Sequence, residues 1–278
     1  MKKLIRLFSV FIFLLISIFY TNKSIDILKA NDPIMKSIKQ TKEKYTINPI
    51  DAIIDNDEIT SGTYGKEIDY QESYNKMKKY GQYNETLTVI KDTKPTISIE
   101  NNYDKYLVKG NSKKRNIALV FKLHEIKDIT NLLILLEKKD AQVTFFIDGK
   151  LLENNLDMIK KLSNHQIEIL SYDNKIDNVL LKTSISYLET ITNRKPQYCY
   201  TEENNNELLK ICKKNKLHTI KPTLIIKENV YEELKKYVEK NIVISVDNFQ
   251  INDLENGISY LKSKGYNLVT VSDLFNEK

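Results

Sequence analysis

Side chains that could bind a metal or transfer a proton lie near the ends of several predicted strands. They are His124, Asp148, Glu168, Asp173 and Asp247. Carboxylates and imidazole are common ligands of catalytic divalent metals and common acids and bases of hydrolases. No regular spacing relates the five residues, so a hydrolase site assembled from them is an alternative interpretation and not the favoured one.

The element that must position such residues is a strand–helix–strand unit. Residues 117–121 form a continuous apolar run, which is typical of a strand buried on both faces. Residues 129–136 carry Ile and Leu at helical spacing after Asp128, a candidate N-cap, and residues 141–147 predict a second strand. Two such strands pair in parallel through a right-handed crossover. Functional residues in parallel sheets follow the carboxyl ends of strands, which here directs attention to residues 122–125.

The same alternation continues to the end of the chain. Further strands are expected near 166–171, 197–200, 217–221, 241–246 and 266–271, with helical patterns between most of them. Gly265 is placed to end the last of these helices. Seven strands alternating with helices predict an α/β fold with a parallel sheet, either doubly wound or closed as a small barrel.

A tyrosine-rich stretch precedes this alternation, between about residues 48 and 112. Tyr70, Tyr74, Met77 and Tyr80 recur at helical spacing and predict a helix over 69–80. For this stripe we favour a packing face over a platform on which sugars stack.

The first 24 residues resemble a signal peptide or signal-anchor helix. A basic start precedes an apolar run over 7–20, and the flanking Lys and Arg predict that the bulk of the protein lies outside the cytoplasm. No clear cleavage site follows, so we favour a membrane anchor, with secretion after cleavage as the alternative. Residues 25–47 are interpreted as a polar spacer.

Charge and cysteine usage limit the other functions. The net charge is +6, and three of these charges come from residues 2–6, so the remainder carries +3. Without a concentrated basic face, no nucleic-acid partner is expected. Cys199 and Cys212 match no metal-binding spacing, and we favour two buried thiols over a disulfide.

Three segments of the strand pattern, 117–121, 143–150 and 165–172, resemble the NodB-homology polysaccharide deacetylases, as does the close of the chain over 265–274. The resemblance implies a distorted (β/α) barrel of about seven parallel strands over 115–278. Residues 48–55 and 67–77 resemble the N-terminal extension of a sporulation-associated, deacetylase-like branch, which implies an extension over 48–114.

The resemblance also implies a chemistry, whose residues are replaced here. Family members remove acetyl groups from cell-wall or chitin-like sugars with a divalent metal held by one Asp and two His, a second Asp as base and a late His as acid. In the same register Lys122 takes the place of the base and Leu123 that of the metal-binding Asp. Tyr172 and Ile176 replace the metal-binding histidines, and Val246 replaces the late histidine. Apolar side chains neither ligate a metal nor move a proton.

We therefore predict a polysaccharide deacetylase-like cell-envelope protein without catalytic activity and without a metal cofactor. Its predicted partner is a peptidoglycan-like cell-wall glycan or a membrane protein. The candidate glycan groove at the strand ends comprises Lys122, His124, Tyr172, Asp173, Tyr200 and Asp247. The alternatives are an active carbohydrate deacetylase with a rearranged site and an unrelated exported α/β domain.

Overall fold

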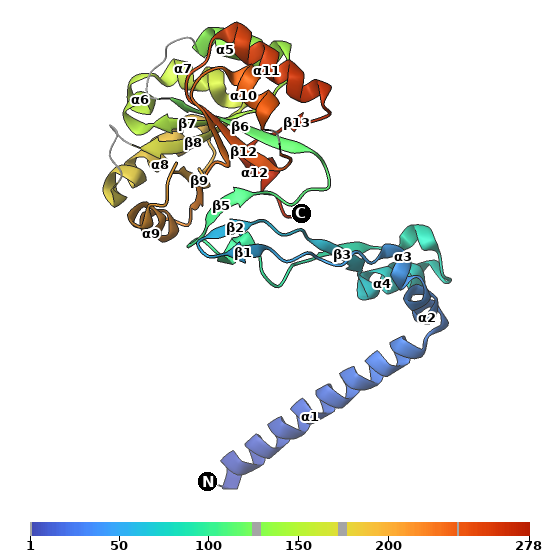
Figure 1. Cartoon of the computed structure of the whole chain (residues 1–278). Helices are drawn as coiled ribbons and strands as arrows, with labels where there is room; N and C mark the ends of the chain where they lie inside the picture. Colours follow the sequence, from blue (N-terminus) through green and yellow to red (C-terminus); the bar gives the residue numbers. More distant parts are fainter. Residues whose placement is uncertain (1, 124–128, 172–176, 238) are drawn as a thin grey trace. The chain divides into compact units, whose positions relative to one another are not determined.

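The computed structural model describes residues 2–123, 129–171, 177–237 and 239–278 (Figure 1). Two compact units make up the chain. The N-terminal unit comprises Met1–Pro49 and Gly65–Thr93, and the sheet unit comprises Ile50–Tyr64 and Lys94–Lys278. The expected extension over 48–114 is thus divided between the two units. The segments that flank Gly65–Thr93 fold with the sheet.

The N-terminal unit is a small helical cluster with one hairpin. Its elements are α1 (Lys2–Asn31), α2 (Pro33–Gln40), α3 (Lys42–Tyr45), β3 (Gly65–Ile68), α4 (Tyr70–Tyr80), η1 (Glu85–Leu87) and β4 (Ile90–Thr93). The Asp32 carboxylate caps α2 by accepting the N–H of Ile34 at 2.9 Å. Ile38 of α2 is fully buried against the core of this unit. Residues 33–45 are therefore folded, which corrects the interpretation of 25–47 as a spacer.

Helix α4 confirms the predicted helix over 69–80 and most of its packing face. Tyr74 and Met77 are buried, and the Tyr74 hydroxyl donates to Asp32 at 3.0 Å. Tyr80, at the end of the stripe, is exposed. Gly81 ends the helix in the left-handed region, at φ +93°.

Within the described residues, one helical segment is long and apolar enough to cross a membrane. It is Phe11–Asn31 of α1, with a mean hydropathy of 1.5 and no buried residues. Signal sequences meet the same test, so this segment agrees with either form of the N-terminal prediction.

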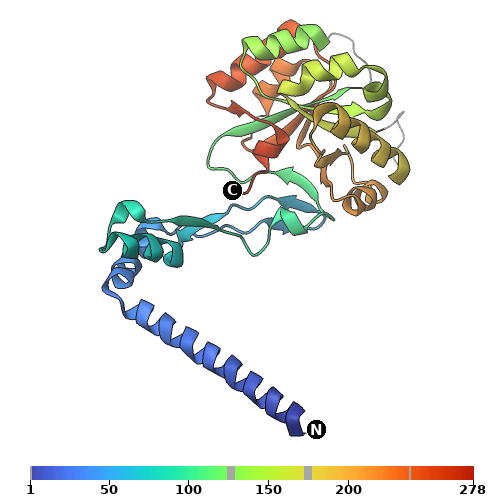
Figure 2. The same cartoon turned by 180° about the vertical axis from the view of Figure 1, so that it is seen from behind.

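The sheet unit alternates strands with helices, as predicted (Figure 1; Figure 2). Before the first crossover come β1 (Ile53–Asp55), β2 (Glu58–Thr60), η2 (Ile99–Asn101) and β5 (Tyr106–Lys109). The next elements are β6 (Asn116–Leu123), α5 (Ile129–Lys138), β7 (Thr144–Asp148), α6 (Gly149–Asn154), α7 (Leu156–Lys161), η3 (Leu162–Asn164), β8 (Gln166–Ser171) and α8 (Asn178–Thr192). The last are β9 (Tyr198–Tyr200), α9 (Asn206–Lys214), β10 (His218–Ile220), β11 (Leu224–Ile226), α10 (Val230–Lys236), β12 (Ile242–Val246), α11 (Ile251–Ser263), β13 (Asn267–Leu268) and α12 (Val271–Leu274).

These strands form one mostly parallel sheet in the order β1-β2-β5-β12-β6-β7-β8. Strand β10 pairs with β5 and β9, β11 pairs with β12, and β13 pairs with β6. Among the described strands of this sheet, the β1–β2 and β5–β12 pairings are antiparallel and the others are parallel. The predicted α/β class is confirmed. Closure into a barrel is not detected, because β8 and β9 are not hydrogen-bonded strand neighbours in the part of the chain described here.

Burial on both faces of the central strand explains its apolar run. Along β6, Ile117, Leu119 and Phe121 join the larger hydrophobic core, while Ala118 and Val120 join a second core on the opposite face. Side chains alternate between faces along a strand, so a strand buried on both sides must be continuously apolar.

The ends of two elements near the end of the sheet unit can be compared with the predictions. Gly265 has φ +76° just after α11, the left-handed conformation expected of a glycine that ends a helix. The last predicted strand is shorter than expected, because β13 covers only Asn267–Leu268 and α12 begins at Val271.

The two cysteines form a disulfide, so the preference for free thiols was wrong. Cys199 in β9 and Cys212 in α9 are both buried, with their Cα atoms 6.3 Å apart. The α9 helix brings Cys212 into the same hydrophobic layer as Cys199. A separation of 13 positions in the sequence gave no sign of this approach.

Candidate functional site

Three of the six predicted groove residues meet at the carboxyl ends of the strands. The Lys122 ammonium lies 3.1 Å from Asp247 Oδ1 and forms a second ion pair with Glu202. It also lies 5.6 Å from the centre of the Tyr200 ring. The side chains of Lys122 and Asp247 are only 16% and 17% exposed, so water screens this pair weakly. We call Lys122, Tyr200, Glu202, Ser245 and Asp247 the Lys122 site.

The strand register brings these residues together. Strands β6 and β12 run in parallel with Val120 opposite Ser245 and Phe121 opposite Val246. Lys122 and Asp247 are the next residues on each side and therefore lie at the same edge of the sheet. Tyr200 is the last residue of β9.

Hydrogen bonds connect three residues of the site, Tyr200, Ser245 and Asp247. The Tyr200 hydroxyl donates to Ser245 Oγ at 2.8 Å, and Ser245 Oγ donates to Asp247 Oδ1 at 3.2 Å. Tyr200 is almost fully buried, and burial raises the pKa of its phenol far above the ordinary value. The phenol therefore remains a hydrogen-bond donor at neutral pH.

Lys122 remains charged in this setting. Burial lowers the pKa of its ammonium, but the hydrogen bonds to Glu202 and Asp247 outweigh burial and leave the pKa above its usual value. A lysine can act as a general base only when it loses its proton. Lys122 is therefore a fixed hydrogen-bond donor and not a base.

Comparison with known proteins gives this arrangement a context. No family model matches the chain. The uncharacterized protein YlxY of Bacillus subtilis is 24% identical over an alignment 280 residues long, gaps included. The alignment covers 91% of this chain and 87% of YlxY. The crystal structure of BA3943 from Bacillus anthracis, described as a pseudoenzyme of the CE4 family, has a TM-score of 0.66 and 21% identity. It covers 89% of this chain and 96% of its own chain.

A second solved structure belongs to the same group. PdaA of Bacillus subtilis, described as a family 4 carbohydrate esterase, has a TM-score of 0.55 at 18% identity and covers 81% of this chain and 96% of its own. The chain has the fold of carbohydrate esterase family 4. The resemblance to NodB-homology deacetylases is thereby confirmed as a resemblance of fold.

The metal of the family 4 chemistry does not fit the residues found here. Leu123, which the family resemblance aligns with the metal-binding Asp, is an apolar side chain buried in the larger core. The neighbouring Lys122 ammonium would repel a divalent cation. In the described part of the chain, no group of three or more His, Cys, Asp or Glu side chains could hold a metal.

The three described acids of the alternative hydrolase site have different hydrogen-bond partners. Asp148 is buried at the end of β7, where it accepts the Lys150 N–H at 3.0 Å and the Ser171 hydroxyl at 2.5 Å. Glu168 is buried in β8 and accepts the backbone N–H groups of Gln197 and Tyr198 at 2.7 and 2.9 Å. Asp247 belongs to the Lys122 site. Asp148 therefore caps a helix, Glu168 holds the backbone at the start of β9, and Asp247 belongs to an ion pair.

The remaining predicted residues, His124, Tyr172 and Asp173, lie outside the described residues, as does Ile176. Two members of the Lys122 site were missed in the sequence. Glu202 could have been suggested by its position two residues after a predicted strand. Ser245 lies inside an apolar strand, and only the register with β6 shows its role.

Proposed function

We propose that this protein is a catalytically inactive relative of the family 4 esterases that binds cell-wall glycan at the Lys122 site. The observation that carries the proposal is the ion pair of Lys122 with Asp247, at the position where the family chemistry needs a free base beside a metal. The description of BA3943, a protein of similar fold, as a pseudoenzyme is consistent with this proposal.

The chemistry of the Lys122 site suits a sugar. Its ammonium offers donors, and the carboxylates of Asp247 and Glu202 offer acceptors, a combination that matches sugar hydroxyl groups. Glu202 keeps 35% of its side chain exposed, so part of this polar cluster is open to a ligand. A glycan hydroxyl would bind there by adding hydrogen bonds to a network that is already ordered.

We further propose that the protein acts outside the cytoplasm, held at the membrane by its first helix. The apolar segment Phe11–Asn31 and the basic residues that precede it support an anchor with the remainder exported. Secretion after cleavage is the alternative. N-terminal sequencing of the exported protein distinguishes the two.

The test is co-sedimentation of the full-length chain, in detergent micelles, with insoluble peptidoglycan in the presence and absence of a chelator. We expect the protein to pellet in both conditions. Lys122→Met should reduce pelleting, because it removes the donors of the site. Lys138→Met, which changes an exposed lysine of α5, is the matched control and should pellet like the parent protein.

Two outcomes would oppose the proposal. Pelleting that the chelator abolishes would indicate a metal and favour an active deacetylase with a rearranged site. Protein that stays in the supernatant would contradict glycan binding and favour the other predicted partner, a membrane protein.

A further inference from the structure

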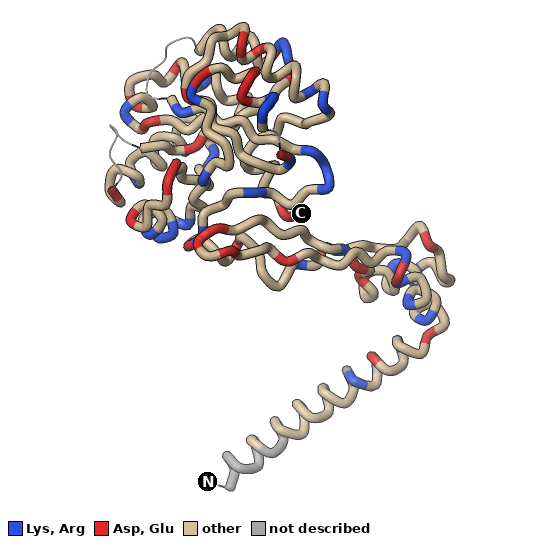
Figure 3. The backbone as a smooth tube through the Cα atoms, viewed as in Figure 1, with Lys and Arg blue, Asp and Glu red and all other residues tan. Residues whose placement is uncertain are grey.

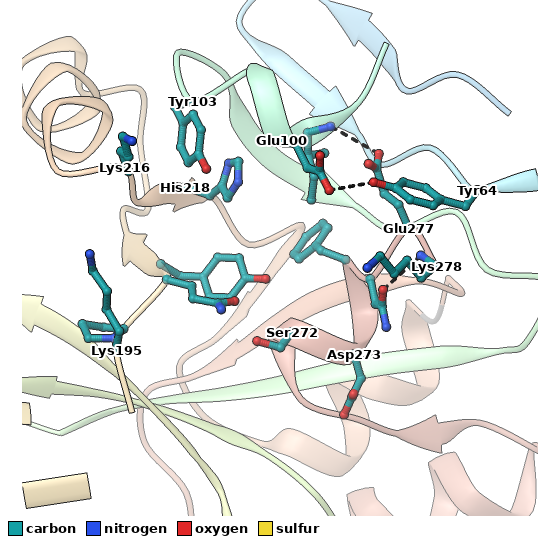
Figure 4. Close-up of a pocket in the computed structure, with 16 residues that line it drawn as sticks. Tyr64, Glu100, Tyr103, Lys195, Lys216, His218, Ser272, Asp273, Glu277 and Lys278 are labelled. Atoms are coloured by element: carbon teal, nitrogen blue, oxygen red, sulfur yellow. Dashed lines mark hydrogen bonds between the residues drawn. The ribbon is translucent and has the colours of Figure 1, made fainter. Parts of the chain in front are cut away.

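A groove runs along the opposite end of the sheet, at the amino ends of β8, β9 and β10. Its largest part is a cavity of about 610 Å³ lined by Tyr103, Tyr198 and His218 (Figure 4). Tyr198 and His218 are the first residues of β9 and β10, whereas Tyr200 of the Lys122 site is the last residue of β9. This groove and the Lys122 site therefore lie at opposite ends of the strands.

Two neighbouring cavities extend it. A cavity of about 490 Å³ shares Lys195, Gln197 and Ser272 with the first. A third, of about 340 Å³, shares His165 and Arg194 with the second. Because neighbouring cavities share lining residues, we treat the three together and call them the amino-end groove. Its extent suits a chain of several units better than one small molecule.

The charge available in this groove is positive. Basic and acidic residues are interspersed along the sheet unit (Figure 3), so a local excess depends on which of them are neutralised. Arg194, Lys195, Lys216 and Lys278 line the groove, and none of them takes part in an ion pair of the described residues. Lys278 lies 6.0 Å from the centre of the Tyr64 ring, and no ion pair among the described residues competes with a ligand for any of the four.

The acids that line the largest cavity accept hydrogen bonds from within the chain. Glu100 pairs with Lys94 at 2.7 Å and accepts the Tyr64 hydroxyl at 2.6 Å (Figure 4). Glu277 is buried and accepts the Gly62 N–H at 2.7 Å. Asp273 accepts the Thr270 hydroxyl at 2.7 Å. Within the described residues, Glu100 is the acid of this set that has a lysine partner, whereas Asp273 and Glu277 accept from neutral donors and keep their charge. The four unpaired cations therefore leave the groove a modest excess of positive charge.

The wall of the groove adds ring surfaces and neutral polar groups. The Tyr103 ring stacks on His218 with centres 4.2 Å apart and an angle of 12° between the rings, and Lys216 lies beside this pair (Figure 4). His165 and His218 are about nine-tenths buried, and the Nδ1 atom of each makes no hydrogen bond with the described residues. Burial lowers the pKa of His218 to about 4, so its imidazole is neutral at neutral pH. Stacked rings and neutral imidazoles are suited to sugar rings and hydroxyl groups, which a site for a bare anion does not need.

We infer that the amino-end groove binds a linear carbohydrate that carries carboxylate groups. Cations along the groove account for the charge of such a ligand, and the aromatic wall accounts for its sugar body. This groove contains none of the residues of the Lys122 site. Experiments on the groove therefore test this inference separately from the function proposed above.

The test is calorimetric titration of the full-length chain with three probes. They are a hexameric oligogalacturonide, the neutral hexamer of N-acetylglucosamine, and inorganic polyphosphate of similar length. We expect the oligogalacturonide to bind more tightly than either of the others, and its affinity to fall as salt is added.

Variants locate the binding. The double substitution Lys195→Ala and Lys216→Asn should weaken oligogalacturonide binding about tenfold, because it removes two of the four cations. Asn is chosen at 216 because this residue has φ +56°, which asparagine tolerates. Tyr103→Ala should weaken the oligogalacturonide and leave polyphosphate unaffected. Lys138→Ala, on α5, is the control and should bind like the parent chain.

Each contrary result overturns a stated part of the inference. Equal affinity for the neutral hexamer would refute a requirement for carboxylate. Equal affinity for polyphosphate would show attraction of charge alone and refute recognition of sugar. Unchanged binding by the folded double variant, or no binding of oligogalacturonide at all, would remove the groove as its site. Circular dichroism of each variant confirms that it is folded.

Discussion

At the scale of single residues, Lys122 shows how one substitution changes the chemistry available to a fold. An aspartate at this position could accept a proton beside a metal, whereas a lysine held between Asp247 and Glu202 can only donate. The ion pair is largely shielded from water, so removing one partner leaves the other charge poorly compensated.

We expect Lys122→Met to lower the free energy of unfolding by roughly 1–3 kcal/mol, because Asp247 loses its partner in a poorly hydrated place. In combination with Asp247→Asn the loss should be less than additive, by about 1 kcal/mol. Urea unfolding followed by circular dichroism measures both effects. Strict additivity would show that the pair is not coupled. Lys138→Met, at an exposed ion pair, should change stability little.

Two buried residues, Glu168 and His218, should change the free energy of unfolding in opposite directions as the pH changes. Burial raises the pKa of Glu168 to about 7 and lowers that of His218 to about 4. Above its usual pKa of about 4.5, Glu168 keeps its proton only in the folded state, so its contribution falls as the pH rises from 4.5 to 7. Below its usual pKa of about 6.5, His218 gains a proton only in the unfolded state, so its contribution falls as the pH drops from 6.5 to 4.

The two contributions oppose each other between pH 4.5 and 6.5, and each amounts to roughly 3 kcal/mol over its full range. We expect Glu168→Gln to make the free energy of unfolding rise more steeply with pH over this window, and His218→Gln to make it fall. Urea unfolding at several pH values tests this. Identical slopes in the parent chain and in both variants would contradict the assignment.

At the scale of elements, the junction between β8 and β9 is held by a side chain. Glu168 accepts the N–H groups of Gln197 and Tyr198, at the start of β9, although the two strands are not hydrogen-bonded neighbours in the described chain. Beyond this junction, the disulfide between Cys199 and Cys212 connects β9 to α9. Short strand β9 is thus fixed by side-chain bonds on both sides.

We expect the paired substitution of Cys199 and Cys212 by Ala to lower the free energy of unfolding by about 2–4 kcal/mol, because the bond closes a short loop in the unfolded chain. Urea unfolding under non-reducing conditions measures the loss. Addition of reductant should destabilise the parent chain and leave the variant unchanged. A variant as stable as the oxidised parent would contradict a structural role for the bond.

The sequence predicted the elements whose apolar pattern is long and regular. The continuous run of β6 and the helical stripe of α4 each followed from the periodicity of burial. The proximity of Lys122 and Asp247 followed as well, because parallel strands bring their carboxyl ends to one edge. Short strands such as β1, whose residues are all exposed, carry no such pattern, and neither they nor the disulfide could be predicted.

The amino-end groove was also invisible in the sequence, for a physical reason. Its cations and rings come from segments far apart in the chain, such as Tyr103, Lys195 and Lys216. Each is an ordinary surface residue until the strand order places them together. Pairing also matters, since only the structure shows which lysines already have a carboxylate partner.

At the scale of the whole molecule, the two units carry different features. The N-terminal unit carries the apolar segment of α1 and a core of its own, centred on Ile38 and Met77. The sheet unit carries the family 4 fold and both candidate binding surfaces. This division agrees with our proposal of a binding module that is held at the membrane and built on the fold of an enzyme.

The most direct test of this account is the metal content of the full-length chain, purified without chelator from cells grown with added zinc. Elemental analysis should find zinc, cobalt and manganese only at background level, because buried Leu123 cannot ligate a metal and the Lys122 ammonium beside it would repel a cation. One equivalent of metal per chain, lost when Asp247 is replaced by Ala, would contradict the central claim and return the protein to the active deacetylases.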